Sequence, residues 1–201
     1  MRCPTWVKAS EIDNWAQSNF ARSLLPDLIR RLVLATVDRA DLRDIDFPAY
    51  DEAQRPGYDG ITLTDITTTY VPFGFCVWEM SCQDPPRSKA DEDYEKRVEK
   101  NRDKDLSQIA YVAITARDWN GAGKWAAEKS ADGTFKEVRA YDSDRLEHWL
   151  LDAPAVALWF REQLGNPVKG VTDVDTYWKN LWATLGRQLT PDVLRRTEKG
   201  R

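Results

Sequence analysis

The chain has 201 residues, of which 42% are hydrophobic, and its formal net charge is −4. This length is enough for one domain with its own core. The acidic balance argues against nucleic-acid binding through bulk charge, although a local basic face would suffice for DNA. Three cysteines without CxxC spacing and a single histidine, His148, argue against a zinc site. With no signal-like start and no apolar run of membrane-spanning length, we expect a cytoplasmic protein without a membrane partner.

Two helices are predicted near the N-terminus. The first begins at Ser10, which forms a capping-box pattern with Asp13 ahead of apolar residues at helical spacing. The second carries Pro26 in its first turn and a broad apolar stripe over residues 25–36. The apolar faces predict that the two helices pack on each other.

Two neighbouring strands follow, and each carries an acid. Residues 58–63 alternate in hydrophobicity and place Asp59 on the face of apolar residues, and residues 75–81 form a second strand after a Pro/Gly reversal. Glu79 lies among Phe, Val, Trp and Met, where a carboxylate without a partner would take up a proton or a cation. If the strands pair as a hairpin, Asp59 and Glu79 approach each other, and two hard oxygen donors suit Mg²⁺.

Each acid also has an interpretation without chemistry. Asp59 precedes Gly60, and Asp-Gly is a common turn pair. Glu79 can be the buried ion-pair partner of an arginine. Both alternatives remain open at the level of the sequence.

The middle of the chain predicts a charged helix and two further strands. Residues 89–105 alternate in charge sign, which is typical of an exposed helix stabilised by its own ion pairs, or of one that offers cations to phosphates. Residues 109–115 are nearly all apolar, which predicts a central strand beside the strand of Glu79. Residues 117–125 are interpreted as a loop, and residues 135–141 alternate as a strand nearer the sheet edge.

The last third predicts helices. Asp144 and Glu147 form a capping-box pattern, Pro154 opens a further helix that Gly165 closes, and Thr172 caps a terminal helix with a wide apolar stripe. His148 is interpreted as a surface or packing residue, because no acidic or nucleophilic companion is visible. The wide stripe predicts contact with the sheet, another subunit or another domain.

Several motifs along the chain resemble one family. They are Arg55-Pro56-Gly57-Tyr58-Asp59-Gly60, Tyr70-Val71-Pro72-x-Gly74, Val77-Trp78-Glu79 and Lys89-Ala90-Asp91-x-Asp93-Tyr94-x-Lys96-Arg97. Together they resemble the PD-(D/E)XK restriction-endonuclease-like domain at the N-terminus of bacterial antiviral STAND ATPases of the Avs type. Shorter likenesses upstream and downstream extend the resemblance over most of the chain.

The resemblance implies an α/β fold with a restriction-endonuclease-like core. We expect a mixed central sheet of about four strands flanked by helices over residues 1–165. A helical extension over residues 166–201 is expected to lead to ATPase and sensor domains of a larger parent protein. The parent protein is expected to act as a homo-oligomer.

The resemblance also implies a site in which Asp59 and Glu79 bind Mg²⁺ or Mn²⁺ and a lysine assists. The usual signature places that lysine two residues after the glutamate, where this chain has Ser81. Either Lys89, at the start of the next helix, takes the role, or the site is weakened. A further acid could come from Asp27 or Asp38 near the ends of the second helix, or from residues 51–52.

The expected function is metal-dependent cleavage of DNA in antiphage defence, with Asp59, Glu79 and Lys89 as catalytic residues. Nucleic-acid contacts are expected from four basic residues, Lys96, Arg97, Arg117 and Lys124. A non-catalytic recognition or assembly domain on a degenerate nuclease scaffold is the alternative from another class. An RNA-cleaving enzyme would use the same site.

Overall fold

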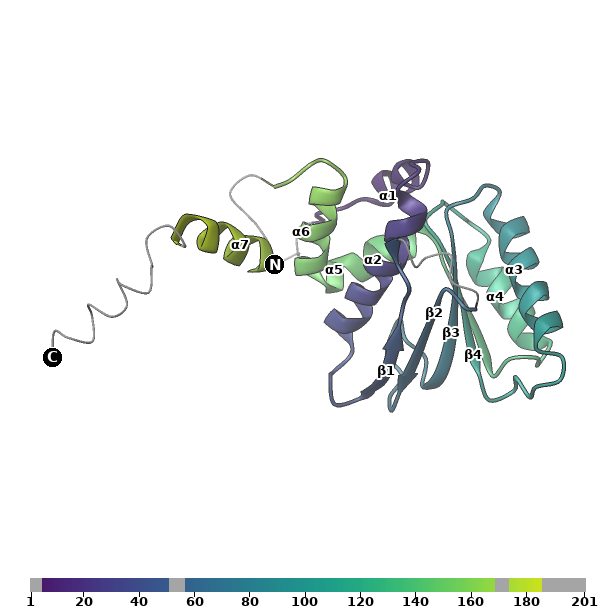
Figure 1. Ribbon diagram of the computed structural model, residues 1–201. Helices are drawn as coiled ribbons and strands as arrows, with labels where there is room; N and C mark the ends of the chain where they lie inside the picture. The colour runs from purple at the N-terminus through teal and green to yellow at the C-terminus, as the bar shows by residue number, and fades with distance from the viewer. Residues whose placement is uncertain (1–4, 51–56, 169–173, 186–201) are drawn as a thin grey trace, which may run out of the picture.

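The structure, a computed structural model, describes residues 5–50, 57–168 and 174–185, and the structural statements below concern these ranges. They contain seven helices and five strands (Figure 1). In chain order the elements are α1 (Ala9–Trp15), α2 (Ala21–Thr36), β1 (Leu42–Asp46), β2 (Gly60–Thr64), β3 (Gly74–Ser81), α3 (Pro86–Lys100), β4 (Ala110–Thr115), α4 (Ala122–Ala131), β5 (Glu137–Tyr141), α5 (Ser143–Asp152), α6 (Pro154–Gln163) and α7 (Val174–Leu185). The expected α/β fold is confirmed.

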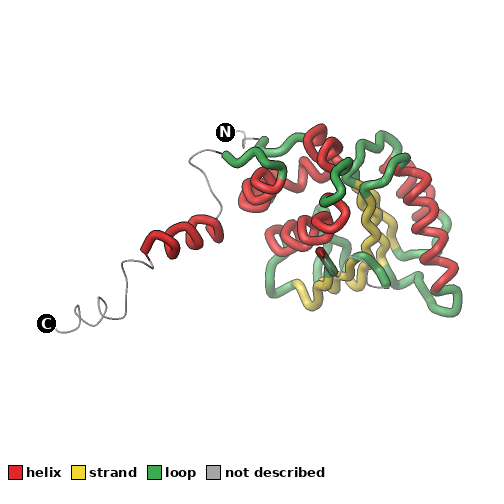
Figure 2. Tube along the Cα trace, turned by 45° about the horizontal axis from the view of Figure 1, so that its top comes forward, coloured by secondary structure: helices red, strands yellow, loops and turns green. Residues whose placement is uncertain are grey.

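The five strands form one mixed sheet in the order β1-β2-β3-β4-β5. β1, β2 and β3 pair antiparallel, whereas β3–β4 and β4–β5 pair parallel. The predicted hairpin, the central position of β4 beside the strand of Glu79, and the edge position of β5 are therefore confirmed. Because a parallel pair needs a crossover, α3 and α4 cover one face of the sheet, and α2, α5 and α6 cover the other (Figures 1 and 2).

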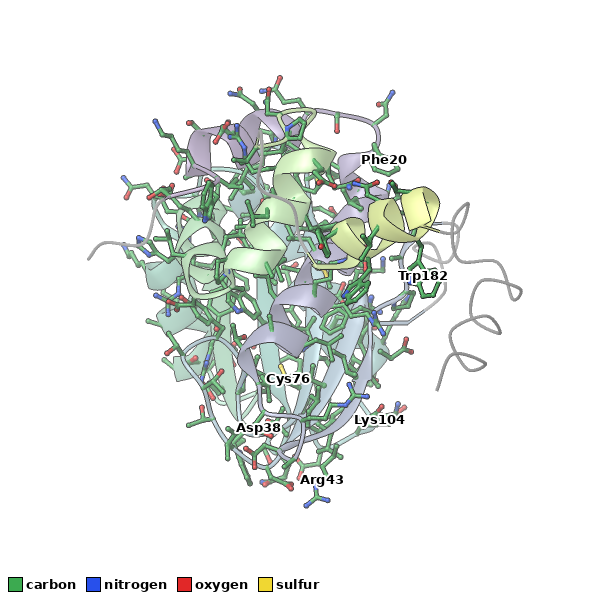
Figure 3. The ribbon with its side chains drawn as sticks, turned by 90° about the vertical axis from the view of Figure 1, so that its left-hand side faces the viewer. Phe20, Asp38, Arg43, Cys76, Lys104 and Trp182 are labelled. Atoms are coloured by element: carbon green, nitrogen blue, oxygen red, sulfur yellow. The ribbon has the colours of Figure 1, made fainter. Side chains whose placement is uncertain are left out.

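The face under α2, α5 and α6 is an apolar layer, which we call the α2-side core. Alternate residues of the central strands point into it, with Cys76 and Trp78 from β3 and Val112 from β4, all fully buried. Figure 3 labels Cys76 among the strands behind α2. Trp149 of α5 stacks near Trp78, with ring centroids 6.3 Å apart.

The opposite face, under α3 and α4, is the α3-side core. It is smaller and rich in aromatic residues, with Tyr94 of α3 in edge contact with Tyr111, Trp125 and Phe135. Val77 of β3 points into it, so Glu79, two residues further on, shares this face.

Two elements were missed by the sequence analysis. β1 has the sequence Leu-Arg-Asp-Ile-Asp and lies at the edge of the sheet. Its three charged residues obscure the alternation of apolar and polar side chains that is typical of a strand. α4 begins at Ala122, within the segment interpreted as a loop, and glycines at its start obscure it.

Two of the predicted caps were wrong. Lys8 is the N-cap of α1, and its backbone N–H donates to Glu11 Oε2 at 2.9 Å, so the Ser10 pattern has no part in it. Asp142, not Asp144, caps α5 by accepting a hydrogen bond from the Arg145 N–H at 3.0 Å. Capping patterns repeat at short intervals in polar segments, so spacing alone does not select the residue used.

Other boundaries near the ends of helices fall differently. α2 begins at Ala21, so Pro26 lies inside the helix rather than in its first turn. α6 begins at Pro154 as predicted, and Gly165 follows it with a positive φ of 74°, the backbone that a closing glycine adopts readily.

α7 lies apart from the other helices (Figure 1) and exposes much of its apolar stripe. Tyr177, Trp178 and Trp182 are more than half exposed, and Trp182, labelled in Figure 3, is 64% exposed. The cap predicted at Thr172 lies outside the described residues. None of the helices that the structure describes has both the length and the apolar character needed to cross a bilayer.

Candidate active site

The structure brings Asp59 and Glu79 together at the β2–β3 ladder. Gly60 pairs with Trp78, so the same register places Asp59 opposite Glu79. The Asp59 Oδ2 atom accepts a hydrogen bond from the backbone N–H of Met80 at 2.7 Å, which fixes this carboxylate against β3. Asp59 stands just before β2, as a turn residue would, but its side chain binds the neighbouring strand.

Glu79 is 5% exposed and forms a two-pronged ion pair with Arg97 of α3. The Arg97 Nε atom donates to Oε1 of Glu79, and Nη2 donates to Oε2 at 3.1 Å. Nη2 also donates to the carbonyl of Gly57, and the guanidinium carbon lies 4.8 Å from the centroid of the Tyr58 ring. The guanidinium is therefore held on three sides, and the ion-pair interpretation of Glu79 describes this conformation.

In this geometry Arg97 has partners within the protein. The residue was expected among the nucleic-acid contacts, but its side chain is buried and its donors are used by Glu79 and Gly57. On α3, Arg97 belongs to the face that packs on the sheet. Charge alternation in the sequence did not separate this buried face from the exposed one.

Burial raises the pKa of both acids, because it removes water from the ionised carboxylates. It raises the pKa of Glu79 to about 8, with the nearby charges of Asp59 and Asp93 adding to the effect and Arg97 opposing it. Burial also raises the pKa of Asp59, against the Met80 hydrogen bond and Arg97, which lower it. One arginine thus compensates only part of the cost of placing these carboxylates here.

Lys89 is paired within its own helix. Its Nζ atom lies 2.7 Å from Asp93 Oδ1 and 3.5 Å from Glu92 Oε2. Burial lowers the pKa of Lys89, but its acidic partners outweigh burial and raise that pKa above its usual value, so the ammonium stays charged. Lys89, Asp93 and Arg97 are spaced by four residues and share one face of α3.

A small cavity adjoins Glu79 on the α3 side. It has room for about one water molecule (about 10 Å³) and is lined in part by Glu79, Asp93 and Tyr111. The Tyr111 hydroxyl is the one buried side-chain polar atom, among the described residues, without a hydrogen-bond partner. Ser81, at the position of the usual lysine, lines the same cavity. A phosphate group does not fit this space, so the site is closed in this conformation.

The donor set fits a divalent ion in its chemistry, because the carboxyl groups of Asp59 and Glu79 are hard oxygen donors on neighbouring strands, and Asp93 lies near enough to influence both electrostatically. Arg97, however, already holds both oxygens of Glu79. A metal at this site would therefore have to share or displace the guanidinium.

Three other acids come closer together than these do. Among the described residues, Asp118, Asp142 and Asp144 are the set whose ligand atoms lie within 4.8 Å of one another. Asp142 caps α5 and Asp144 lies in its first turn, where negative charge is favourable without a metal. Sequence analysis did not predict this cluster, because it forms between a loop and a helix that are distant in the chain.

The remaining acids named from the sequence lie elsewhere or have other partners. Asp27 accepts hydrogen bonds from Arg31 and Tyr50, each at 3.0 Å, and Asp38 accepts one from the Ala40 N–H at 2.8 Å. Residues 51–52 fall outside the described ranges. These observations add no third acid from α2 to the site.

The other predicted nucleic-acid contacts divide into two kinds. Lys96 and Lys124 are exposed, and Lys124 Nζ lies 3.9 Å from Glu128 Oε1. Arg117 is partly buried, and its guanidinium donates to the carbonyls of Cys82 and Asp13 at 3.0 and 3.2 Å. Its contacts join the loop after β3 to α1.

Comparison of the chain with protein-family models, curated proteins and solved structures finds no match in any of the three. The topology of the sheet and the geometry around Glu79 are therefore the basis for the function proposed below.

Proposed function

We propose that the chain is a metal-dependent endonuclease domain of the PD-(D/E)XK type that hydrolyses DNA, with Asp59 and Glu79 as ligands of Mg²⁺ or Mn²⁺. The observation that carries the proposal is the placement of these two acids opposite each other across the β2–β3 ladder, on a partly buried face. The mixed sheet, with α3 crossing between parallel β3 and β4, supports the same class.

The proposed hydrolysis depends on carboxylate oxygens that bind a hard divalent ion at a partly buried site. When bound, the ion supplies a polarised phosphoryl oxygen and a more acidic water. Asp59 and Glu79 hold the ion, and the Lys89 ammonium stabilises charge on the phosphate as the bond breaks. In the structure Lys89 forms an ion pair with Asp93, on the same helix face as Arg97. Lys89 can therefore contact the phosphate only after this ion pair breaks.

We further propose that the domain is the cytoplasmic effector of a larger antiphage protein and becomes active when ATPase and sensor domains assemble several copies. The closed cavity supports an inactive resting state, because the space beside Glu79 holds about one water rather than a phosphate. The exposed aromatic residues of α7 offer a surface for assembly.

Isosteric substitutions test the two acids. Asp59→Asn and Glu79→Gln remove charge while keeping side-chain shape, and each is expected to reduce plasmid nicking by the activated parent protein at least about 100-fold. The measurement is conversion of supercoiled to nicked plasmid in Mg²⁺ or Mn²⁺. Asp144→Asn, in the other acidic cluster, is the matched control and is expected to cut normally. Cleavage at the wild-type rate by either site variant would remove this mechanism.

The alternative is a non-catalytic recognition or assembly domain, which the engagement of both Glu79 oxygens by Arg97 favours. Calorimetric titration with Mn²⁺ separates the two functions. A nuclease binds the ion in a way that Glu79→Gln abolishes, whereas a scaffold shows no such dependence. The same titrated protein is then assayed on DNA and RNA, since residues at this site would serve either substrate.

A further inference from the structure

We propose that Arg97 is an internal cation that competes with the divalent ion for Glu79, and that the ion binds when the guanidinium moves back one helical turn to Asp93. This inference rests on the proposed function. In this proposal Arg97 is not a metal ligand. It controls metal affinity by occupying or leaving the carboxylate of Glu79.

The contacts of Arg97 are those of an occupied cation site. Both oxygens of Glu79, the carbonyl of Gly57 and the face of the Tyr58 ring surround one guanidinium. Carboxylate and carbonyl oxygens are also the atoms that a hard divalent ion takes as ligands. The same oxygens cannot be fully engaged by both cations at once.

Asp93 provides a second position for the guanidinium. It lies four residues before Arg97, so the two side chains project from the same face of α3, and long helical side chains point back toward the N-terminus. Glu79 and Asp93 both line the cavity that holds about one water, so free space already adjoins both carboxylates. Asp93 now pairs with Lys89, and arrival of Arg97 would release that ammonium for the phosphate.

The charges around Glu79 favour replacement of Arg97 by the divalent ion over simultaneous binding of both cations. Asp59 and Glu79 must be ionised to bind a metal, and Asp93 forms an ion pair with Lys89. A divalent ion added to these three carboxylates with both Lys89 and Arg97 in place gives the cluster net positive charge, whereas movement of the guanidinium to Asp93 with release of Lys89 leaves the cluster neutral.

Metal titration of the full chain tests the exchange. Arg97→Gln removes the competitor and is expected to tighten Mn²⁺ binding at least about tenfold, because a buried ion pair no longer has to be broken. Arg97→Lys keeps the charge without the planar fork and is expected to lie between the two. Lys100→Gln, which removes an exposed charge from the same helix, is the control and is expected to change affinity less than about twofold.

A second comparison isolates Asp93. Asp93→Asn is expected to weaken Mn²⁺ binding in the wild-type background but to leave the affinity of the Arg97→Gln protein unchanged. Asp93 matters in this proposal only as the second ion-pair partner of the Arg97 guanidinium, which Arg97→Gln removes. Equal weakening of Mn²⁺ binding in both backgrounds would identify Asp93 as a direct metal ligand and overturn its assignment as the second partner of Arg97.

A measurement on the wild-type chain covers the case in which Arg97→Gln does not fold. In protein labelled with ¹⁵N-arginine, the Nε–H resonance of Arg97 is expected to shift on addition of Mg²⁺, and Lys100→Gln should show the same shift. An unmoved resonance at saturating metal overturns the exchange.

The outcomes separate the two proposals. If wild type binds Mn²⁺ through Glu79 with the same affinity as Arg97→Gln, the nuclease proposal stands and the exchange is wrong. If neither protein binds the ion, both are wrong.

Discussion

The two faces of the sheet carry buried polar groups of different kinds. Trp78 and Glu79 are adjacent in sequence, yet the first points into the α2-side core and the second toward α3. On the α2 side two buried polar atoms of the sheet and its aromatic neighbours have neutral partners: Trp78 Nε1 donates to Thr62 at 3.1 Å, and the Tyr141 hydroxyl donates to the Tyr70 carbonyl at 2.7 Å.

On the α3 side, two buried groups of the central strands, Glu79 and the Tyr111 hydroxyl, lack neutral partners of this kind. Glu79 depends on one arginine, and the Tyr111 hydroxyl adjoins a cavity without a hydrogen bond. Such groups cost stability wherever they are not fully compensated. One face of this sheet therefore maintains the fold, whereas the other keeps the features from which a binding site can be built.

The largest expected effect tests the α2-side core. Trp78 is fully buried between Phe47 and Trp149, with ring centroids 5.7 and 6.3 Å away. Trp78→Ala is expected to lower the free energy of unfolding by about 3–5 kcal/mol, because a large cavity replaces these contacts. The measurement is urea denaturation followed by far-UV circular dichroism.

Trp182→Ala is the matched control, since the same residue type is 64% exposed on α7. It is expected to change the free energy of unfolding by no more than about 0.5 kcal/mol. A loss at Trp182 comparable to that at Trp78 would show that α7 packs on the body and would contradict the separation of the two regions.

Two tyrosines sharpen the contrast between the faces. Tyr141→Phe removes a satisfied hydroxyl and leaves the Tyr70 carbonyl without its donor, so we expect a loss of about 1 kcal/mol. Tyr111→Phe removes a hydroxyl that has no partner, so we expect no loss or a small gain. Denaturation midpoints of the two variants give the comparison directly.

A clear loss in Tyr111→Phe would mean that the hydroxyl has a partner in solution, most simply a water in the adjacent cavity. The buried tyrosine hydroxyls of the two faces would then both be hydrogen-bonded, and Tyr111 would no longer distinguish the α3 side from the α2 side.

Much of the fold could be predicted from the sequence, because it depends on local periodicity. The alternation of residues 75–81 placed Glu79 and Trp78 on opposite faces of β3, and the apolar run at 109–115 placed β4 in the buried interior of the sheet. β1 was missed because an edge strand with one exposed face needs few apolar residues.

The candidate site was predicted in part. The hairpin register followed from the turn and the strand pattern, so the proximity of Asp59 and Glu79 could be foreseen. The partner of Glu79 could not, since Arg97 lies 18 residues away within a helix rich in exposed charges. Which face of α3 packs on the sheet is decided by Tyr94 and its aromatic neighbours, and not by the pattern of charges.

The smallest expected effect is a change in pH dependence on the α3 side. The Tyr94 hydroxyl donates to Asp132 at 2.9 Å, and burial together with this bond raises the pKa of Tyr94 to about 12. A tyrosine with a higher pKa in the folded than in the unfolded state contributes stability that is complete below about pH 10 and is lost as pH rises toward 12. The pKa of Asp132 is lowered, although burial opposes this, because the Thr134 N–H and Tyr94 bond its oxygens. This carboxylate therefore contributes stability at neutral pH that is lost as pH falls below about 4.

Tyr94→Phe is accordingly expected to flatten the pH dependence of the denaturation midpoint between pH 10 and 12 and to weaken it slightly in acid. Tyr141, whose pKa burial also raises to about 12, serves as the comparison on the α2 side. Because its partner is a carbonyl rather than an acid, Tyr141→Phe is expected to flatten the alkaline limb alone. If Tyr94→Phe leaves the acid limb unchanged, the Tyr94–Asp132 hydrogen bond does not stabilise the protein in solution, and the α3 side loses this ionisable contact.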